Sequence, residues 1–248
     1  MSEDLRVDRE RRFHDRVFAD GSRAVADKFY EVAESSKLFY ERALCAQPPG
    51  QALEYGCGRG SHAYMLAKAG WKVLGIDISN EAIRQAEARA EAEGLADSVV
   101  FRIMDAERLE LRDGSVDLVC GSGILHHLNW QASLAEVARV LRPDGRGVFI
   151  EPLGHNPLIN LYRRRTPRLR TADEHPLRIN DLRLARDWFE RVDVHPFHLS
   201  VLAAVPFRRQ GWFDVAVSVF DRLDHALFKL PGTGRYAWQV VLEFARPR

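Results

Sequence analysis

The sequence predicts an α/β fold in which a mostly parallel sheet has helices on both faces. Strand and helix patterns alternate from about Gln51 to Ile150, as a parallel sheet with crossover helices requires. The first strand of this alternation also runs into a glycine-rich turn before a helix. The chain has 248 residues, of which 46% are hydrophobic, so it is long enough to bury one sizeable core. We therefore expect a single domain over residues 1–248.

The first half of the alternation contains two strands and two helices. Short apolar runs predict the strands, and segments of helical composition predict the helices, the second of which is rich in Ala, Glu and Arg. The expected order is a strand at Gln51–Tyr55, a helix at His62–Ala69, a strand at Trp71–Ile76 and a helix at Ser79–Glu93. The last helix has the clearest ends, because Ser79 suits its N-cap and Gly94 its C-cap.

The second half continues with β-branched, apolar segments of strand length. Short runs that are apolar on both faces and bounded by turn residues are typical of buried parallel strands. The expected elements are strands at Ser98–Ile103 and Val116–Cys120, a helix at Ala132–Leu141, a turn at Pro143-Asp144-Gly145 and a strand at Gly147–Ile150.

The regular alternation lapses after Glu151. We expect two irregular insertions there, at residues 152–180 and 199–234. Around them we expect a helix at Asp181–Glu190, a strand at Arg191–His195 and a closing strand at Tyr236–Phe244. Residues 1–45 are expected to form an N-terminal helical segment.

Composition narrows the function classes. Lys and Arg number 36 against 35 Asp and Glu, so the chain lacks the basic field typical of nucleic-acid binding, and no nucleic-acid partner is expected. The three cysteines have neither paired spacing nor a zinc-ligand pattern, so no metal site is expected. No apolar run approaches the roughly 20 residues that span a bilayer. We expect a cytoplasmic protein with at most peripheral membrane contact.

A glycine-rich turn and two acidic residues at strand ends carry the strongest chemical signal. Gly56, Gly58 and Gly60 follow the first strand, where glycine permits positive φ and lets a ligand approach the backbone. Asp77 ends the next strand, about 20 residues on, where a carboxylate accepts from ribose hydroxyls. Asp105 ends the third strand and could accept from an adenine amino group. The alternatives are that Asp77 is a helix N-cap and that Asp105 is a solvated loop residue.

The segments LEYGCGRG, GIDIS, MDAERL and VDLVCGSGILHHL resemble the successive motifs of class I S-adenosylmethionine (SAM)-dependent methyltransferases. The following segment, EVARVLRPDGRGVFIEP, resembles the helix and strand that come after these motifs in the same superfamily, especially in the branch that contains the ubiquinone and menaquinone biosynthesis methyltransferases. The resemblance covers about Tyr40 to Glu151. It implies a Rossmann-like fold with a seven-stranded sheet and an antiparallel final strand, with residues 50–151 as the SAM-binding core. It also implies methyl transfer from SAM that leaves S-adenosyl-L-homocysteine.

The same resemblance assigns the cofactor contacts residue by residue. Glu54 and the glycine backbone would hold the methionine part, Asp77 the ribose, and Asp105 with Ala106 the adenine. The complete set that it implies is Glu54, Gly56, Cys57, Gly58, Gly60, Asp77, Ile78, Asp105, Ala106 and Gly121. The commonest form of the first motif has Asp followed by Leu or Ile where this chain has Glu54 and Tyr55, although glutamate is frequent at that position in the family.

Methyl transfer asks little of side chains, because the sulfonium is already an activated electrophile that needs alignment with its acceptor. An oxygen acceptor of high pKa, or a carbon acceptor, would benefit from a general base. The candidates are His126, His127, Glu151, His155 and His175. Among them we select His126 as the catalytic residue. The alternative is a structural or cofactor-side role for the LHHL segment, which is widespread in related sequences.

We expect the two insertions to form the pocket for the methyl acceptor. The first begins beside the sheet edge where the cofactor would lie and carries a basic cluster at Arg163, Arg164, Arg165, Arg168 and Arg170. The second has apolar residues at helical spacing, which predict core packing or a lid. A small, lipid-like or polyketide-like acceptor with a polar or anionic head would suit both, whereas the alternative for the arginines is a solvated loop.

Two other functions share part of this pattern. A NAD-dependent oxidoreductase also has a glycine-rich turn and a distal acidic residue, but the third glycine of its fingerprint falls on Ser61 here. A non-catalytic binding protein with the methyltransferase fold is the other alternative.

Overall fold

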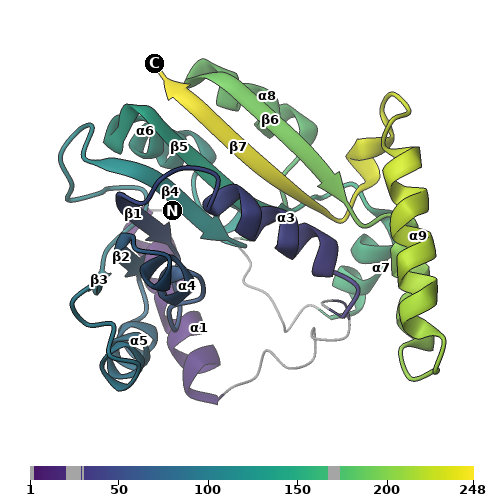
Figure 1. Cartoon of the computed structure of the whole chain (residues 1–248), viewed down its shortest axis with the longest axis horizontal. Coiled ribbons are helices and arrows are strands. Elements are labelled where there is room, and N and C mark those ends of the chain that lie inside the picture. The colour runs from purple at the N-terminus through teal and green to yellow at the C-terminus, as the bar shows by residue number, and fades with distance from the viewer. Residues whose placement is uncertain (1–2, 21–28, 30, 167–173) are drawn as a thin grey trace.

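A computed structural model describes residues 3–20, 29, 31–166 and 174–248. It contains a seven-stranded sheet of order β3-β2-β1-β4-β5-β7-β6 (Figure 1). The strands are β1 Gln51–Tyr55, β2 Lys72–Asp77, β3 Val99–Ile103, β4 Val116–Ser122, β5 Leu141–Pro152, β6 Phe189–Phe197 and β7 Gln239–Pro247. Only the pairs of β7 with β5 and with β6 are antiparallel. The predicted Rossmann-like sheet with an antiparallel final strand is confirmed.

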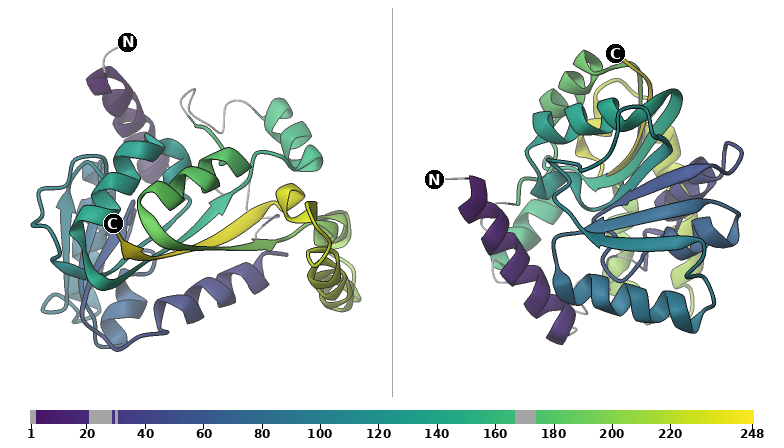
Figure 2. Two further views of the ribbon diagram at one scale, coloured as in Figure 1. Left: turned by 90° about the horizontal axis from the view of Figure 1, so that it is seen from above. Right: turned by 90° about the vertical axis from the view of Figure 1, so that its left-hand side faces the viewer.

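Helices cover both faces of this sheet, as predicted. They are α1 Glu3–Asp20, α3 Glu34–Leu44, α4 Ala63–Lys68, α5 Asn80–Ala92, α6 Trp130–Val140, α7 Pro157–Arg165, α8 Ile179–Leu184 and α9 Phe213–Leu227. Figure 2 shows α3 on one side of the sheet and α6 and α8 on the other. Each face has its own buried cluster, with Leu134 of α6 and Leu182 of α8 in one and Leu44 of α3 and Leu66 of α4 in the other.

Local capping chemistry fixes the ends of the helices nearest the site. The Ser79 side chain accepts a hydrogen bond from Ala82 N at 3.2 Å, and Gly94 beyond α5 has φ +66°. Both ends of this helix are therefore where the sequence predicts them. The Asn129 side chain caps α6 in the same way.

Three predicted boundaries differ from the structure. Pro143-Asp144-Gly145 lies inside β5 as a bulge, because the pairing advances from Val116–Leu141 directly to Leu118–Arg146. The helix expected at Asp181–Glu190 runs only over α8 and a 3-10 turn, η4 Ala185–Asp187, since Phe189 already enters β6 and stacks on Phe244. The last strand begins at Gln239 rather than Tyr236, which ends the 3-10 turn η6 Thr233–Tyr236.

The two insertions pack on each other beyond the end of the sheet. The second contains a 3-10 segment, η5 Ser200–Phe207, and α9. Ile159 of α7 joins Val201 and Val205 of η5 in one buried cluster, and Phe213, Val217 and Phe220 of α9 pack against it. The predicted core packing of α9 therefore holds for this face, whereas Leu223 and Leu230 are exposed. Arg168 and Arg170 lie outside the described residues.

The N-terminal segment is helical at 3–20 and 34–44, and residues 21–28 and 30 lie outside the description. Helix α1 lies against α5, as Figure 2 shows, and therefore beside the carboxyl ends of the central strands. Within the described residues, no helix combines the length and the apolar character that a bilayer span requires.

Candidate cofactor and active site

A cavity opens at the carboxyl ends of β1, β2, β3 and β4, the position where open α/β sheets bind ligands. The loops after these strands form most of its wall, and α1 covers it from outside. Its lining is Arg6, Val7, Glu10, His14, Phe18, Gly56, Ile76, Asp77, Ile78, Met104, Asp105, Ala106, Glu107, Ser122, Gly123, Ile124, His127 and Leu128. Among the described residues, neither insertion contributes to this wall.

The glycine-rich turn brings the β1 and β4 loops together. Gly56 has φ +56°, and a Cβ atom there would lie 2.7 Å from Ile124 Cδ1. A side chain at this position would therefore push the two loops apart. The turn closes where Gly60 N and Ser61 N both donate to Cys57 O, at 2.8 and 3.0 Å.

Glu54 holds the helix that follows this turn. Its side chain is completely buried and accepts from Ser61 Oγ at 2.5 Å and from His62 N and Ala63 N at 2.9 Å each. These bonds satisfy the first backbone donors of α4. Glu54 does not line the cavity, so its predicted contact with the methionine part stays a prediction.

Asp77 reaches both the glycine-rich turn and the start of α5. Its Oδ2 accepts from Gly58 N and its Oδ1 from Ser79 N, each at 2.9 Å. Because Ser79 rather than Asp77 caps α5, the alternative of an N-cap aspartate is wrong. Asp77 lines the cavity, and each carboxylate oxygen has a second lone pair for a ligand hydroxyl.

Asp105 and Ala106 lie in the same wall beyond β3. The Asp105 Oδ1 accepts from Glu107 N at 2.9 Å, which fixes the carboxylate at the cavity. Ile78, Met104 and Leu128 add apolar surface around it, as a flat aromatic ring would require.

Half of the predicted cofactor residues thus line this cavity and half do not. Those in the wall are Gly56, Asp77, Ile78, Asp105 and Ala106. Those outside the lining are Glu54, Cys57, Gly58, Gly60 and Gly121. Cys57 is completely buried, and burial raises the pKa of its thiol well above the usual range.

The sequence analysis missed the contribution of α1. One face of α1 lines the cavity with Val7, Glu10, His14 and Phe18. The helical spacing of these residues is the one local signal that could have indicated this face. Ion pairing fixes one end of the helix, because Arg6 donates to both oxygens of the buried Glu107 at 2.6 Å.

Two further bonds complete the attachment of α1. The Arg6 side chain also donates to His127 O at 3.0 Å. Near the other end, Asp15 accepts from Ser79 Oγ at 2.5 Å. The helix is therefore bound to the loops after β4 and β2, on both sides of the cavity.

A buried histidine and carboxylate lie directly behind this wall. Glu151, at the end of β5, accepts from Ile124 N and Leu125 N at 2.8 Å each, and its Oε2 lies 2.7 Å from His126 Nδ1. Burial raises the pKa of Glu151 from 4.5 to about 7. His126 is part of a short 3-10 turn, η2 Leu125–His127, and is 9% exposed.

His126 faces the first insertion rather than the cofactor cavity. Its Nε2 lies 4.0 Å from Glu174 Oε1, and its backbone carbonyl accepts from His175 N at 2.8 Å. Its ring lies 4.2 Å, centroid to centroid, from that of His127, which does line the cavity. The structure thus brings the end of the first insertion to His126.

The cavity also holds a group of three side chains that could bind a divalent ion. Glu10, His14 and His127 each have one ligand atom within 4.8 Å of the others, and burial lowers the pKa of His127. His126, His127 and Glu174 form a second such group. Neither group was predictable from local sequence, because each joins residues from two segments that lie far apart in the chain.

The chain is similar to known methyltransferases in both sequence and structure. Residues 53–149 match the family described as Methyltransferase domain. The 27-O-demethylrifamycin SV methyltransferase of Amycolatopsis mediterranei is 40% identical over 97 residues, 38% of this chain and 35% of that protein. The ubiquinone biosynthesis O-methyltransferase of Nitrosococcus oceani is 31% identical over 128 residues, 51% of this chain and 53% of that protein. The chain thus matches only a third to about half of these relatives.

Among solved structures, geranyl diphosphate C-methyltransferase from Streptomyces coelicolor A3(2), in complex with Mg²⁺, geranyl diphosphate and S-adenosyl-L-homocysteine, has a TM-score of 0.62. The match covers 86% of this chain and 79% of that chain at 17% identity, which shows a shared fold.

Proposed function

We propose that this chain, which belongs to the class I SAM-dependent methyltransferases, transfers a methyl group from SAM to a small-molecule acceptor. One observation carries the proposal. The cavity at the strand ends combines two carboxylates, Asp77 and Asp105, with apolar surface and a close backbone turn. A nucleoside needs this combination of acceptors for its hydroxyls and amino group and flat apolar contacts for its base.

The residues of the cavity fit SAM in chemical terms. Asp77 would accept from the ribose hydroxyls, Asp105 with Ala106 would hold the adenine, and Gly56 would lie along the methionine part. Glu54 would act through the turn that it holds. When bound, SAM supplies a methyl group already activated by the sulfonium, so alignment is the chief task of the protein.

His126 is the proposed general base for the acceptor. With Glu151 ionised, Nδ1–H donates to the carboxylate and Nε2 is left as the proton acceptor, directed toward the Glu174 side. Ionisation of Glu151 grows as pH rises through about 7, the value to which burial raises its pKa. The rate of a base-assisted transfer should therefore rise over the same pH interval.

The acceptor is proposed to be a small, lipid-like or polyketide-like molecule that reaches His126 from the first insertion. Supporting this, one relative is named for demethylrifamycin and one solved neighbour holds geranyl diphosphate. Arg163, Arg164 and Arg165 lie on α7 of the same insertion and do not line the cofactor cavity. We infer that they are not the acceptor's main anchor.

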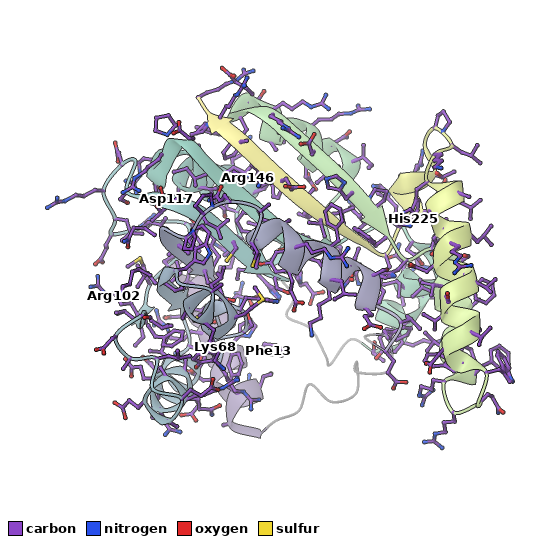
Figure 3. The ribbon with its side chains drawn as sticks, viewed as in Figure 1. Phe13, Lys68, Arg102, Asp117, Arg146 and His225 are labelled. Atoms are coloured by element: carbon purple, nitrogen blue, oxygen red, sulfur yellow. The ribbon has the colours of Figure 1, made fainter. Side chains whose placement is uncertain are left out.

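The test is formation of S-adenosyl-L-homocysteine and of methylated product from a panel of polyketide and isoprenoid acceptors. Replacing His126 by Asn should lower kcat by roughly 100-fold or more, while SAM affinity stays near wild type because His126 lies behind the cavity. His225→Asn is the matched control, since His225 is exposed on the distant α9 (Figure 3).

The outcomes separate the competing functions. A wild-type kcat in the His126→Asn variant would show that His126 has a structural and not a catalytic role. SAM binding without turnover of any acceptor would favour the non-catalytic binding protein. Hydride transfer with NAD, without SAM binding, would favour the oxidoreductase.

A further inference from the structure

A second cavity, of about 820 Å³, lies between the two insertions. It is bounded by the start of α8, the loop after α9, and the strands β6 and β7. Its lining is Leu153, His155, Arg178, Ile179, Asn180, Leu182, Arg183, Val194, Pro196, Phe228, Lys229, Leu230, Pro231, Gly232, Gly234, Arg235 and Val240. No described residue lines both this cavity and the cofactor cavity. Its volume is typical of small-molecule sites.

The charged groups of this lining all have one sign. Arg178, Arg183, Lys229 and Arg235 lie in the wall, and no Asp or Glu does. In the described part of the chain, none of the four makes an ion pair with a carboxylate. Asp181, three residues after Arg178, accepts from the backbone Arg178 N at 2.7 Å. All four residues are exposed, so the wall presents solvated cations to which no described residue supplies a counter-charge.

The floor of the cavity is apolar. Leu153 and Val240 are completely buried beneath it, and Leu182 is 6% exposed. Val194 and Leu230 remain 39% and 55% exposed at its sides. Large aliphatic side chains gathered around a hollow, rather than scattered singly, mark surface that a ligand can cover.

We propose that this cavity binds a small amphipathic anion: a carboxylate or phosphate monoester that carries an apolar chain. The guanidinium groups of Arg178, Arg183 and Arg235 match the planar oxygens of such a head group, and the apolar floor accepts the chain. A bare inorganic anion would leave the floor uncovered, and an uncharged chain would leave the cations unpaired. The site is separate from the cofactor cavity, so its occupancy does not depend on methyl transfer.

The test is calorimetric titration of the full chain with decyl phosphate below its micelle concentration. Inorganic phosphate and decanol are the two reference ligands, for the head group and the chain alone. We expect decyl phosphate to bind at least tenfold more tightly than either. The double variant Arg178→Ala/Arg235→Ala should lose at least tenfold in affinity for decyl phosphate, with unchanged affinity for SAM.

Arg102→Ala is the matched control, because Arg102 is an exposed arginine at the opposite end of the molecule from α9 (Figure 3). A circular dichroism spectrum equal to wild type excludes unfolding of the double variant, and Arg183→Glu gives an independent charge reversal. Equal binding of phosphate or of decanol would overturn the amphipathic ligand. Wild-type affinity in both arginine variants, or displacement of decyl phosphate by SAM, would overturn the site.

Discussion

Asp77 has a structural task and a proposed ligand-binding task. Its carboxylate binds Gly58 N and Ser79 N, and it also lines the cofactor cavity. Asp77→Ala should weaken SAM binding by roughly 1–3 kcal/mol, because it removes hydrogen bonds to a charged group. Calorimetry of the folded variant measures this. Normal SAM affinity would show that Asp77 serves only to join the turn to β2.

The raised pKa of Glu151 predicts how the stability of the protein depends on pH. Burial raises its pKa from 4.5 to about 7, so the folded state holds this proton more tightly than the unfolded chain does. The stability that follows is fully present below about pH 4.5 and is lost as pH rises to about 7. Between these values the wild type should lose about 3 kcal/mol relative to Glu151→Gln, which has no such proton.

Denaturant unfolding of both proteins, from about pH 5 to pH 8, measures this difference. The wild-type free energy of unfolding minus that of Glu151→Gln should fall toward pH 7 and then stay level. Curves that run parallel across the whole interval would mean that Glu151 is already ionised in the folded protein at low pH.

At the scale of single elements, helix α1 covers the cofactor cavity, and one substitution should weaken its attachment to the neighbouring loops. Arg6→Ala removes the ion pair with Glu107, a carboxylate that is only 6% exposed and would keep Asn129 N as its partner. We expect faster amide hydrogen exchange in α1 and weaker SAM binding, because the helix forms one wall of the cavity. Exchange rates in α1 equal to wild type would contradict this, and Arg16→Ala, an exposed arginine of the same helix, is the control.

Asp224 is the corresponding anchor of the second insertion. It is 2% exposed and accepts from the backbone N–H groups of Leu199, Ser200 and Val201, so α9 holds the start of η5. Asp224→Ala should lower the free energy of unfolding by roughly 2 kcal/mol or more, because buried donors lose a charged acceptor. Asp214→Ala, at an exposed position of α9, should leave it within about 0.5 kcal/mol. Equal stability of the two variants would contradict the anchoring role.

The elements also show where sequence reasoning succeeds and fails. Ser79 was predictable as a cap because capping needs only a polar residue and its own helix. Pro143-Asp144-Gly145 has turn residues, yet β5 continues past it, since Leu141 before the bulge and Arg146 after it both pair with β4 while the three residues themselves pair with neither β4 nor β7. The position of α1 was not predictable, because Arg6 and Glu107 are 101 residues apart and no local pattern records such a contact.

At the scale of the whole molecule, the order of the strands in the sheet could be predicted from the order of the motifs. The position of the acceptor site could not. The motifs fix which strand ends meet, so Gly56, Asp77 and Asp105 could be brought together in advance. The insertions have no periodic pattern that tells which wall they form. They line a cavity of their own, and the segment at Glu174 and His175 reaches His126.

The central claim is that the cavity at the carboxyl ends of β1 to β4 is a SAM site. The most direct measurement is calorimetric titration of the wild-type protein with SAM, S-adenosyl-L-homocysteine and NAD, repeated on Asp77→Ala. Both SAM and S-adenosyl-L-homocysteine should bind in roughly the micromolar range, typical of enzyme ligands, and NAD should not bind. Asp77→Ala should weaken both bound ligands together. Absence of heat with SAM and its product on folded protein, or binding of NAD in their place, would contradict the account.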